Sequence, residues 1–213
     1  MLSLAKGSKR PLLLILSYPN EAERLVKAFM EHGIPDCHLA VVTIENWNHD
    51  LSPWPCPSLW KGQAPFGGGA DAYLDILLQD ILPAIKSKIG AEIPYLAIGG
   101  YSLAGLFALY AGYRTNAFSR LASVSGSLWF PAFKDFAKAN TLQKSIGRIY
   151  LSLGDKEKNT KNESMKTVEQ NTSELASFYR NKGIHVTYQI NPGNHFQDME
   201  KRMAKAICAL LED

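Results

Sequence analysis

The sequence contains little cysteine: only Cys37, Cys56 and Cys208, three residues in a chain of 213. Because their number is odd and they lie far apart, we expect no disulfide framework, and a reducing compartment is favoured. Neither these cysteines nor the histidines follow the ligand spacing of a zinc site, so we also expect no metal.

The sequence also lacks clusters of positive charge. The net charge is +3 and charged residues make up 20% of the chain, with no run of five basic residues and no stripe of alternating basic and aromatic residues. A nucleic-acid partner is therefore not expected. No stretch approaches the roughly 18 consecutive apolar residues that a membrane span requires, so we expect no membrane partner either.

The apolar run at residues 11–17 follows Lys6, Lys9 and Arg10 and superficially resembles a secretory signal. It is short, and residues 18–21 (Y-P-N-E) close it without a small-residue cleavage site. A buried strand explains the run equally well. We expect a cytoplasmic protein.

The apolar residues, 46% of the chain, alternate between two patterns. Short, continuously apolar or alternating runs typical of strands are separated by stretches with helical periodicity. The predicted strands are residues 11–17, 39–44, 95–98, 120–124, 148–153 and 184–190. This order predicts an α/β fold in a single domain over residues 1–213, with a mostly parallel sheet of about six strands flanked by helices.

Residues 95–110 (Y-L-A-I-G-G-Y-S-L-A-G-L-F-A-L-Y) predict a strand, a sharp turn and a helix. Ser102 lies at the joint, where a nucleophile elbow places its serine. The G-x-S-x-G pattern is matched at Gly100 and Ser102, whereas Ala104 occupies the second glycine position and Gly105 follows one residue late. The alternative is a glycine-rich packing loop in which Ser102 is only a helix N-cap.

A serine nucleophile needs a histidine base and a carboxylate that orients it. His195 follows the last predicted strand, and Asp155 and Glu157 follow the strand before it, so the order Ser, acid, His is that of α/β-hydrolases. Glu157 has more reach from its loop, while Asp155 could instead cap the turn. We favour Glu157 and keep Asp155 as the alternative.

An oxyanion formed during attack on an ester needs two hydrogen-bond donors, one of them the backbone N–H after the nucleophile. That residue is Leu103. The second donor should come from the turn after the first strand, where Pro19 has no N–H to give. We expect the donor to be Tyr18.

Large aromatic residues crowd an aperiodic loop at residues 45–69 and recur in a loop at residues 125–130. We expect Trp54, Trp60 and Trp129 to wall a substrate pocket. The alternative is that these tryptophans fill one end of the core.

Six segments resemble the esterase D, enterochelin esterase and feruloyl esterase group of the α/β-hydrolases, over most of the chain. They are residues 48–53 (N-H-D-L-S-P), 82–85 (L-P-A-I), 100–106 (G-Y-S-L-A-G-L), 125–129 (S-G-S-L-W), 154–157 (G-D-K-E) and 193–195 (G-N-H). In that group the acid falls three residues after the loop glycine, which implies Glu157 here.

The chain departs from this group in two places. Only ten residues precede the first predicted strand, so we expect it to lack the antiparallel N-terminal strands of fuller members. The usual His-Gly turn after the first strand is replaced by Ser17, Tyr18 and Pro19.

Together these patterns predict a serine hydrolase that cleaves a small-molecule carboxylic ester through an acyl-enzyme, without a cofactor. Two alternatives share the fold: an acyltransferase that uses the same residues, and a non-catalytic binding module. The residues carry no signal for an oligomeric state.

Overall fold

The computed structural model describes residues 1–7, 9–59 and 62–212, and in these ranges a sheet of seven strands forms the centre of the molecule. The strand order across the sheet is β1-β3-β2-β6-β7-β8-β9. The strands are β1 (Leu2–Ser3), β2 (Leu12–Ser17), β3 (His38–Thr43), β6 (Leu96–Tyr101), β7 (Arg120–Val124), β8 (Arg148–Gly154) and β9 (His185–Asn191). A separate hairpin pairs β4 (Pro55–Cys56) with β5 (Phe66–Gly67).

Six strands of this sheet pair in parallel, in the order β3, β2, β6, β7, β8 and β9. This confirms the predicted α/β fold and its mostly parallel sheet. The expectation that the chain lacks antiparallel N-terminal strands was wrong in one detail. Leu2 and Ser3 form a short edge strand, with Leu2 opposite Ala40 and Ser3 opposite Leu39 of β3 in antiparallel register. A strand of two residues has no periodicity, so no sequence pattern could reveal it.

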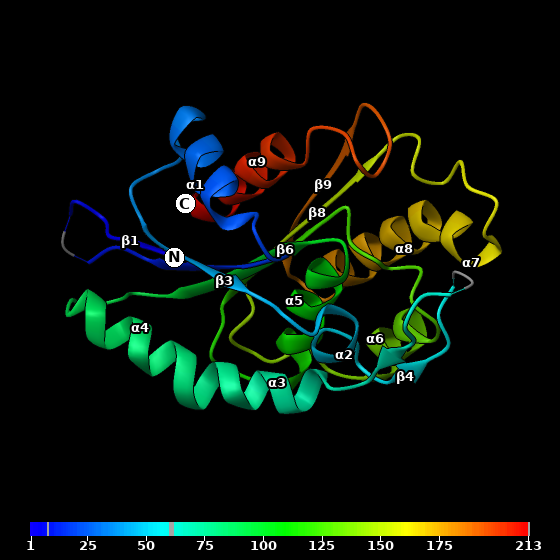
Figure 1. Ribbon diagram of the computed structural model, residues 1–213, viewed down its shortest axis with the longest axis horizontal. Helices are drawn as coiled ribbons and strands as arrows, with labels where there is room; N and C mark the ends of the chain where they lie inside the picture. The colour runs from blue at the N-terminus through cyan, green and yellow to red at the C-terminus, as the bar shows by residue number, and fades with distance from the viewer. Residues whose placement is uncertain (8, 60–61, 213) are drawn as a thin grey trace.

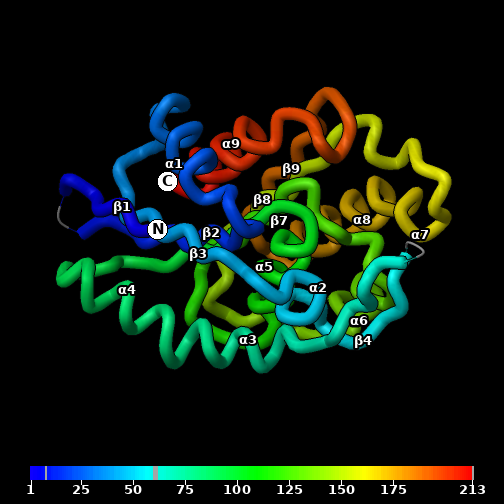
Figure 2. Tube along the Cα trace, viewed as in Figure 1, coloured from blue at the N-terminus to red at the C-terminus, as the bar shows by residue number. Residues whose placement is uncertain are grey.

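Helices cover both faces of the sheet (Figures 1 and 2). The helices are α1 (Ala22–Glu31), α2 (Trp47–Asp50), α3 (Ala70–Ile76), α4 (Leu82–Ile89), α5 (Leu103–Arg114), α6 (Phe133–Ala139), α7 (Glu163–Lys166), α8 (Val168–Asn181) and α9 (Met199–Leu211). Helices α1 and α9 lie together on one face, and α3, α4, α5, α6 and α8 lie on the other. None of the helices within the described ranges is long and apolar enough to cross a membrane.

Strand β2 shows why the sheet needs helices on both sides. All six of its residues are buried, and successive side chains point to opposite faces. Leu12, Leu14 and Leu16 belong to the core beneath α5, whereas Leu13 and Ile15 belong to the core beneath α1 and α9. A continuously apolar strand of this kind is typical of a parallel sheet covered on both faces.

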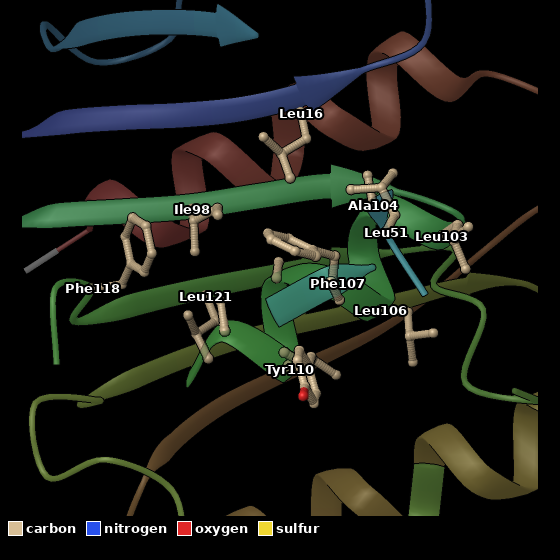
Figure 3. Packing of buried hydrophobic residues seen from close by; sticks show 14 of the residues in the cluster. Leu16, Leu51, Ile98, Leu103, Ala104, Leu106, Phe107, Tyr110, Phe118 and Leu121 are labelled. Carbon is tan, nitrogen blue, oxygen red and sulfur yellow. The ribbon is translucent and has the colours of Figure 1, made fainter. Parts of the chain in front are cut away.

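Helix α5 is buried on all sides, and this fixes its N-terminus against the sheet. Its residues from Leu103 to Tyr113 are all buried. In Figure 3, Ile98 of β6 and Leu121 of β7 point toward the α5 side chains Phe107 and Tyr110. The tight packing holds the β6–α5 junction in one position relative to its neighbouring strands.

A π-helical segment, Leu77–Ile81, joins α3 to α4 just before Pro83. Proline lacks the N–H that would donate to the preceding turn, so a regular α-helix cannot continue through this point unchanged. The local widening into a π-helical turn keeps the two helices in one line across the sheet (Figure 1).

Candidate active site

Ser102 lies between β6 and α5 in a backbone conformation that L-amino acids rarely adopt, with φ 57° and ψ −122°. The turn is possible because Gly100 has no side chain: a Cβ there would lie 2.4 Å from the Cβ of Ala104 and 2.7 Å from its backbone carbon. Strain held in place by such packing is typical of a nucleophile elbow. Ala104, at the second glycine position of the motif, thus fits because Gly100, two residues before the serine, leaves room for its side chain.

The structure brings Ser102, His195 and Glu157 together in one hydrogen-bonded series. Ser102 Oγ lies 3.1 Å from Nε2 of His195, and Nδ1 of His195 lies 2.8 Å from Oε2 of Glu157. The His195 side chain is 25% exposed and that of Glu157 only 4%. With Nδ1 protonated and donating to Glu157, Nε2 is free to accept the Ser102 proton.

Glu157 is ionised in spite of its burial. Desolvation favours its neutral form, but the hydrogen bond and charge of His195 and the backbone N–H of Gly154 hold its pKa below the usual value of a glutamate. That N–H donates to Oε1 over 2.6 Å. The carboxylate can therefore stabilise a positive charge that develops on the imidazole.

Asp155, the alternative acid, has a different partner. Its Oδ1 accepts the backbone N–H of Gly193 over 2.8 Å, and its own N–H donates to Asn191 O over 2.8 Å. Asp155 thus ties the loop after β8 to the loop after β9. The side chain that meets His195 is that of Glu157.

The two expected oxyanion donors follow neighbouring strands, Tyr18 after β2 and Leu103 after the turn that ends β6. Leu103 is the first residue of α5, where backbone N–H groups have no acceptor within the helix. Tyr18 follows β2 directly, and its ring packs edge-on against Trp47 with centroids 5.3 Å apart. Tyr18 and Ser102 line the same hollow.

That hollow has a volume of about 380 Å³ and opens beside Ser102 and His195. Its aromatic walls include Tyr18, Trp47, Tyr101 and Phe196, and Phe196 is 89% exposed. Sequence analysis did not single out Trp47 or Phe196. Trp47 lies in the aromatic loop at residues 45–69, and Phe196 directly follows His195. Their closeness in the sequence to these segments is the only feature that could have indicated a place in the pocket wall.

The structure does not bring Trp54 and Trp129 to this hollow. Trp54 packs against Phe130 and Phe136, and its indole N–H donates to Pro131 O over 3.1 Å. Trp129 is buried and packs against Phe66 and Phe130. The two residues therefore belong to an aromatic cluster in the core, as the alternative interpretation held, and Trp60 lies outside the described residues.

A charged cluster borders the hollow on its other side. The Arg24 guanidinium lies between two carboxylates, with Nε 2.5 Å from Glu200 and Nη2 3.4 Å from Glu21. Burial raises the pKa of Glu21, although Arg24 opposes this change. In the part of the chain that the structure describes, no group of three or more His, Cys, Asp or Glu side chains is placed to hold a metal ion.

Comparison with known proteins places this geometry in a family. The model of the family described as "Putative esterase" matches residues 18–207, which include the elbow, the acid loop and the histidine loop. The chain belongs to this esterase family.

A curated relative of this chain is the "Uncharacterized protein YbbA" of Bacillus subtilis, with 25% identity over 170 residues, which cover 78% of this chain and 68% of the relative. Among solved structures, the siderophore hydrolase EstB from Aspergillus nidulans superposes with a TM-score of 0.77 at 20% identity, over 98% of this chain and 84% of its own. An IroE-like serine hydrolase from Shewanella oneidensis superposes with a TM-score of 0.80 at 17% identity, over 99% of this chain and 74% of its own. At these identities the likenesses to solved structures show the shared fold.

Proposed function

We propose that this esterase hydrolyses a small-molecule carboxylic ester through an acyl-enzyme formed on Ser102, with His195 as the general base and Glu157 as the acid that orients it. The observation that carries the proposal is the series of hydrogen bonds from Ser102 Oγ to His195 and on to Glu157, 3.1 and 2.8 Å long. Family membership supports the reaction class.

In the first half-reaction, Ser102 Oγ attacks the ester carbonyl while its proton passes to Nε2 of His195. Glu157 stabilises the resulting imidazolium through Nδ1. The tetrahedral oxyanion is held by the backbone N–H of Leu103 and, we propose, by that of Tyr18. His195 then returns the proton to the leaving alcohol as the ester C–O bond breaks.

In the second half-reaction, water takes the place of the alcohol. His195 removes a proton from the water, the new oxygen attacks the acyl carbonyl, and Ser102 recovers its proton as the acid product leaves. All of the catalytic groups in this proposed cycle belong to the protein, and water is the second substrate.

The hollow supports a substrate of modest size. Its open, partly aromatic walls at Tyr18, Trp47 and Phe196 could contact an acyl or alcohol portion through apolar faces.

We further propose that residues 1–213 form a single α/β-hydrolase domain. The three cysteines are free thiols, which supports the expectation of a cytoplasmic location.

A panel of carboxylic esters, assayed with the purified protein and with Ser102→Ala, tests the proposal. We expect hydrolysis of at least one small ester, with kcat/KM reduced about 10³-fold or more in the variant. Added alcohols distinguish hydrolysis from acyl transfer, because a transferase would give the new ester as its main product. A wild-type protein that turns over no ester, or a Ser102→Ala variant as active as wild type, would contradict the proposal.

A further inference from the structure

Arg202 is a charged residue whose side chain is almost completely buried. It lies in α9 on the same face as Met199, Met203 and Ala206, and it is 1% exposed. A guanidinium is rarely buried without partners, because the loss of its hydration must be offset by hydrogen bonds and opposite charge. Its partners therefore indicate why it lies there.

All of these partners lie at the carboxyl ends of β6, β7, β8 and β9, and three of these strands, β6, β8 and β9, carry the proposed triad. Nη1 donates to three side chains and Nη2 to two backbone carbonyls. The acceptors are Tyr101 Oη (3.2 Å), Ser125 Oγ (3.0 Å), Glu157 Oε1 (3.0 Å), Pro192 O (2.8 Å) and Asn194 O (3.0 Å). The Nε of Arg202 has no hydrogen-bond partner among the described residues.

We propose that Arg202 is a positioning residue of the active site, which fixes the Glu157 carboxylate and the histidine loop relative to each other. This inference rests on the proposed function. One guanidinium nitrogen binds the Glu157 oxygen that does not face His195, and the other binds carbonyls on both sides of Gly193, just before His195. Arg202 thus contacts both the acid and the backbone of the base loop.

The backbone around Arg202 is shaped to admit the guanidinium. A Cβ on Gly154 would lie 2.2 Å from Gly193 O and about 3 Å from both terminal nitrogens of Arg202, at 2.9 and 3.0 Å. The acid loop and the histidine loop can approach each other and the cation only because residue 154 is glycine. Tyr101, the residue before the serine, extends the network by donating from Oη to His195 O over 2.7 Å.

Arg202 also sets the charge at the site. The ionised Glu157 carboxylate and the Arg202 guanidinium lie 3.0 Å apart, so their charges offset each other. Removing the cation would leave a net negative charge beside His195, so the histidine would hold a proton to higher pH. The acid limb of the pH profile of kcat/KM would then move upward by about one pH unit.

Other titratable groups near the cluster do not alter this sign. Burial raises the pKa of Tyr101, and it raises the pKa of Tyr150 to about 12, so both phenols stay neutral at neutral pH. Across the hollow, Glu21, Arg24 and Glu200 pair with one another. These groups are the same in the wild type and in the variants, so a difference between their profiles reports Arg202.

The test compares Arg202→Met and Arg202→Lys with Arg120→Met. Arg120 is a matched control because its Nη1 donates to two carbonyls at the end of the same helix, Leu210 O and Glu212 O, away from the proposed triad. Circular dichroism and thermal unfolding check the folding of each variant. Steady-state kinetics across pH then give kcat, KM and the acid limb.

For Arg202→Met we expect kcat to fall about 100-fold with little change in KM, and the acid limb to move upward by about one pH unit. For Arg202→Lys we expect the limb to stay in place, because the charge remains, and kcat to fall about tenfold, because an ammonium cannot bind both loops as the guanidinium fork does. For Arg120→Met we expect unchanged kinetics.

A folded Arg202→Met protein with the kcat and acid limb of wild type would overturn the inference. If Arg202→Met does not fold, Arg202→Lys decides: an unchanged kcat would overturn the inference, and a reduced kcat with the limb in place would support it. Failure of the proposed function is distinct, because the wild-type protein itself would then hydrolyse no ester.

Discussion

Glu157 and Asp155 are two residues apart, yet their carboxylates have separate tasks. Glu157 is buried and hydrogen-bonds His195, whereas Asp155 is exposed and accepts the backbone N–H of Gly193. The turn after β8 explains the difference, because the Glu157 N–H donates to Gly154 O and the chain folds back over the strand end. Glu157 thus contacts the imidazole of His195, and Asp155 contacts the loop that carries His195.

Amide substitution at each position separates these tasks. Glu157→Gln removes the negative charge that stabilises the imidazolium, so we expect kcat/KM for ester hydrolysis to fall by about 10³ to 10⁴-fold. Asp155→Asn keeps an oxygen that can accept the Gly193 N–H, so we expect less than about a tenfold loss. Steady-state kinetics of the two variants, with folding checked by circular dichroism, measure both. A larger loss for Asp155→Asn would reassign the acid.

At the residue scale, the sequence was informative where chemistry and chain order coincide. Ser102, His195 and Glu157 each follow a strand in the order of a known hydrolase arrangement, so the sequence could place them at one sheet edge. Trp54 and Trp129 could not be placed, because a buried aromatic in a core cluster and one in a pocket wall have the same local sequence. The sequence does show Arg202 as a lone charged residue within the apolar face of a helix. Its hydrogen-bond partners could not be predicted, because they belong to loops that are distant in the sequence.

At the scale of elements, the strand-turn-helix unit of β6 and α5 depends on contacts that exclude side chains. Gly100 faces Ala104 across the turn, and Gly105 lies where a Cβ would be 2.9 Å from both Gly100 O and Ser123 Oγ. Helix α5 can begin directly above the strand end only because these two positions are glycine. The position of Ser102 therefore depends on the close packing of this turn.

We expect Gly100→Ala to lower the free energy of unfolding by about 2 to 3 kcal/mol, because its Cβ would overlap Ala104 and force the turn apart. The matched control is Gly147→Ala, where an added Cβ meets nothing within 4 Å and the free energy should change by less than about 1 kcal/mol. Urea unfolding followed by tryptophan fluorescence measures both. Equal stability of the two variants would show that the elbow has more room than its geometry indicates.

Elements with strong periodicity were predictable, and short ones were not. The six parallel strands appear within about two or three residues of the predicted bounds, because short runs that are apolar or that alternate between apolar and polar residues are typical of strands. The missing N–H of Pro83 explains why the regular α-helix is interrupted before it, but it does not specify the π-helical form of the interruption. The edge strand Leu2–Ser3 depends on pairing with β3, a contact that local sequence does not encode.

At the scale of the whole molecule, the parallel sheet brings the site together. Strands β6, β7, β8 and β9 are neighbours in the sheet, so Ser102, the loop after β7, Glu157 and His195 all emerge at one edge. Helix α9 then returns across the face of the sheet (Figure 1). Its residue Arg202 hydrogen-bonds the loops after β7, β8 and β9. Residues separated by about a hundred positions in the chain thus form one hydrogen-bonded network.

The central claim is that this network makes Ser102 a nucleophile, and labelling with a fluorophosphonate probe tests it most directly. Intact-mass analysis and peptide mapping of the folded protein should show one adduct, on Ser102, with labelling abolished in Ser102→Ala and much slower in His195→Ala. Absence of an adduct in folded wild-type protein, or an adduct on another residue, would contradict the claim and favour a non-catalytic binding module on the hydrolase fold.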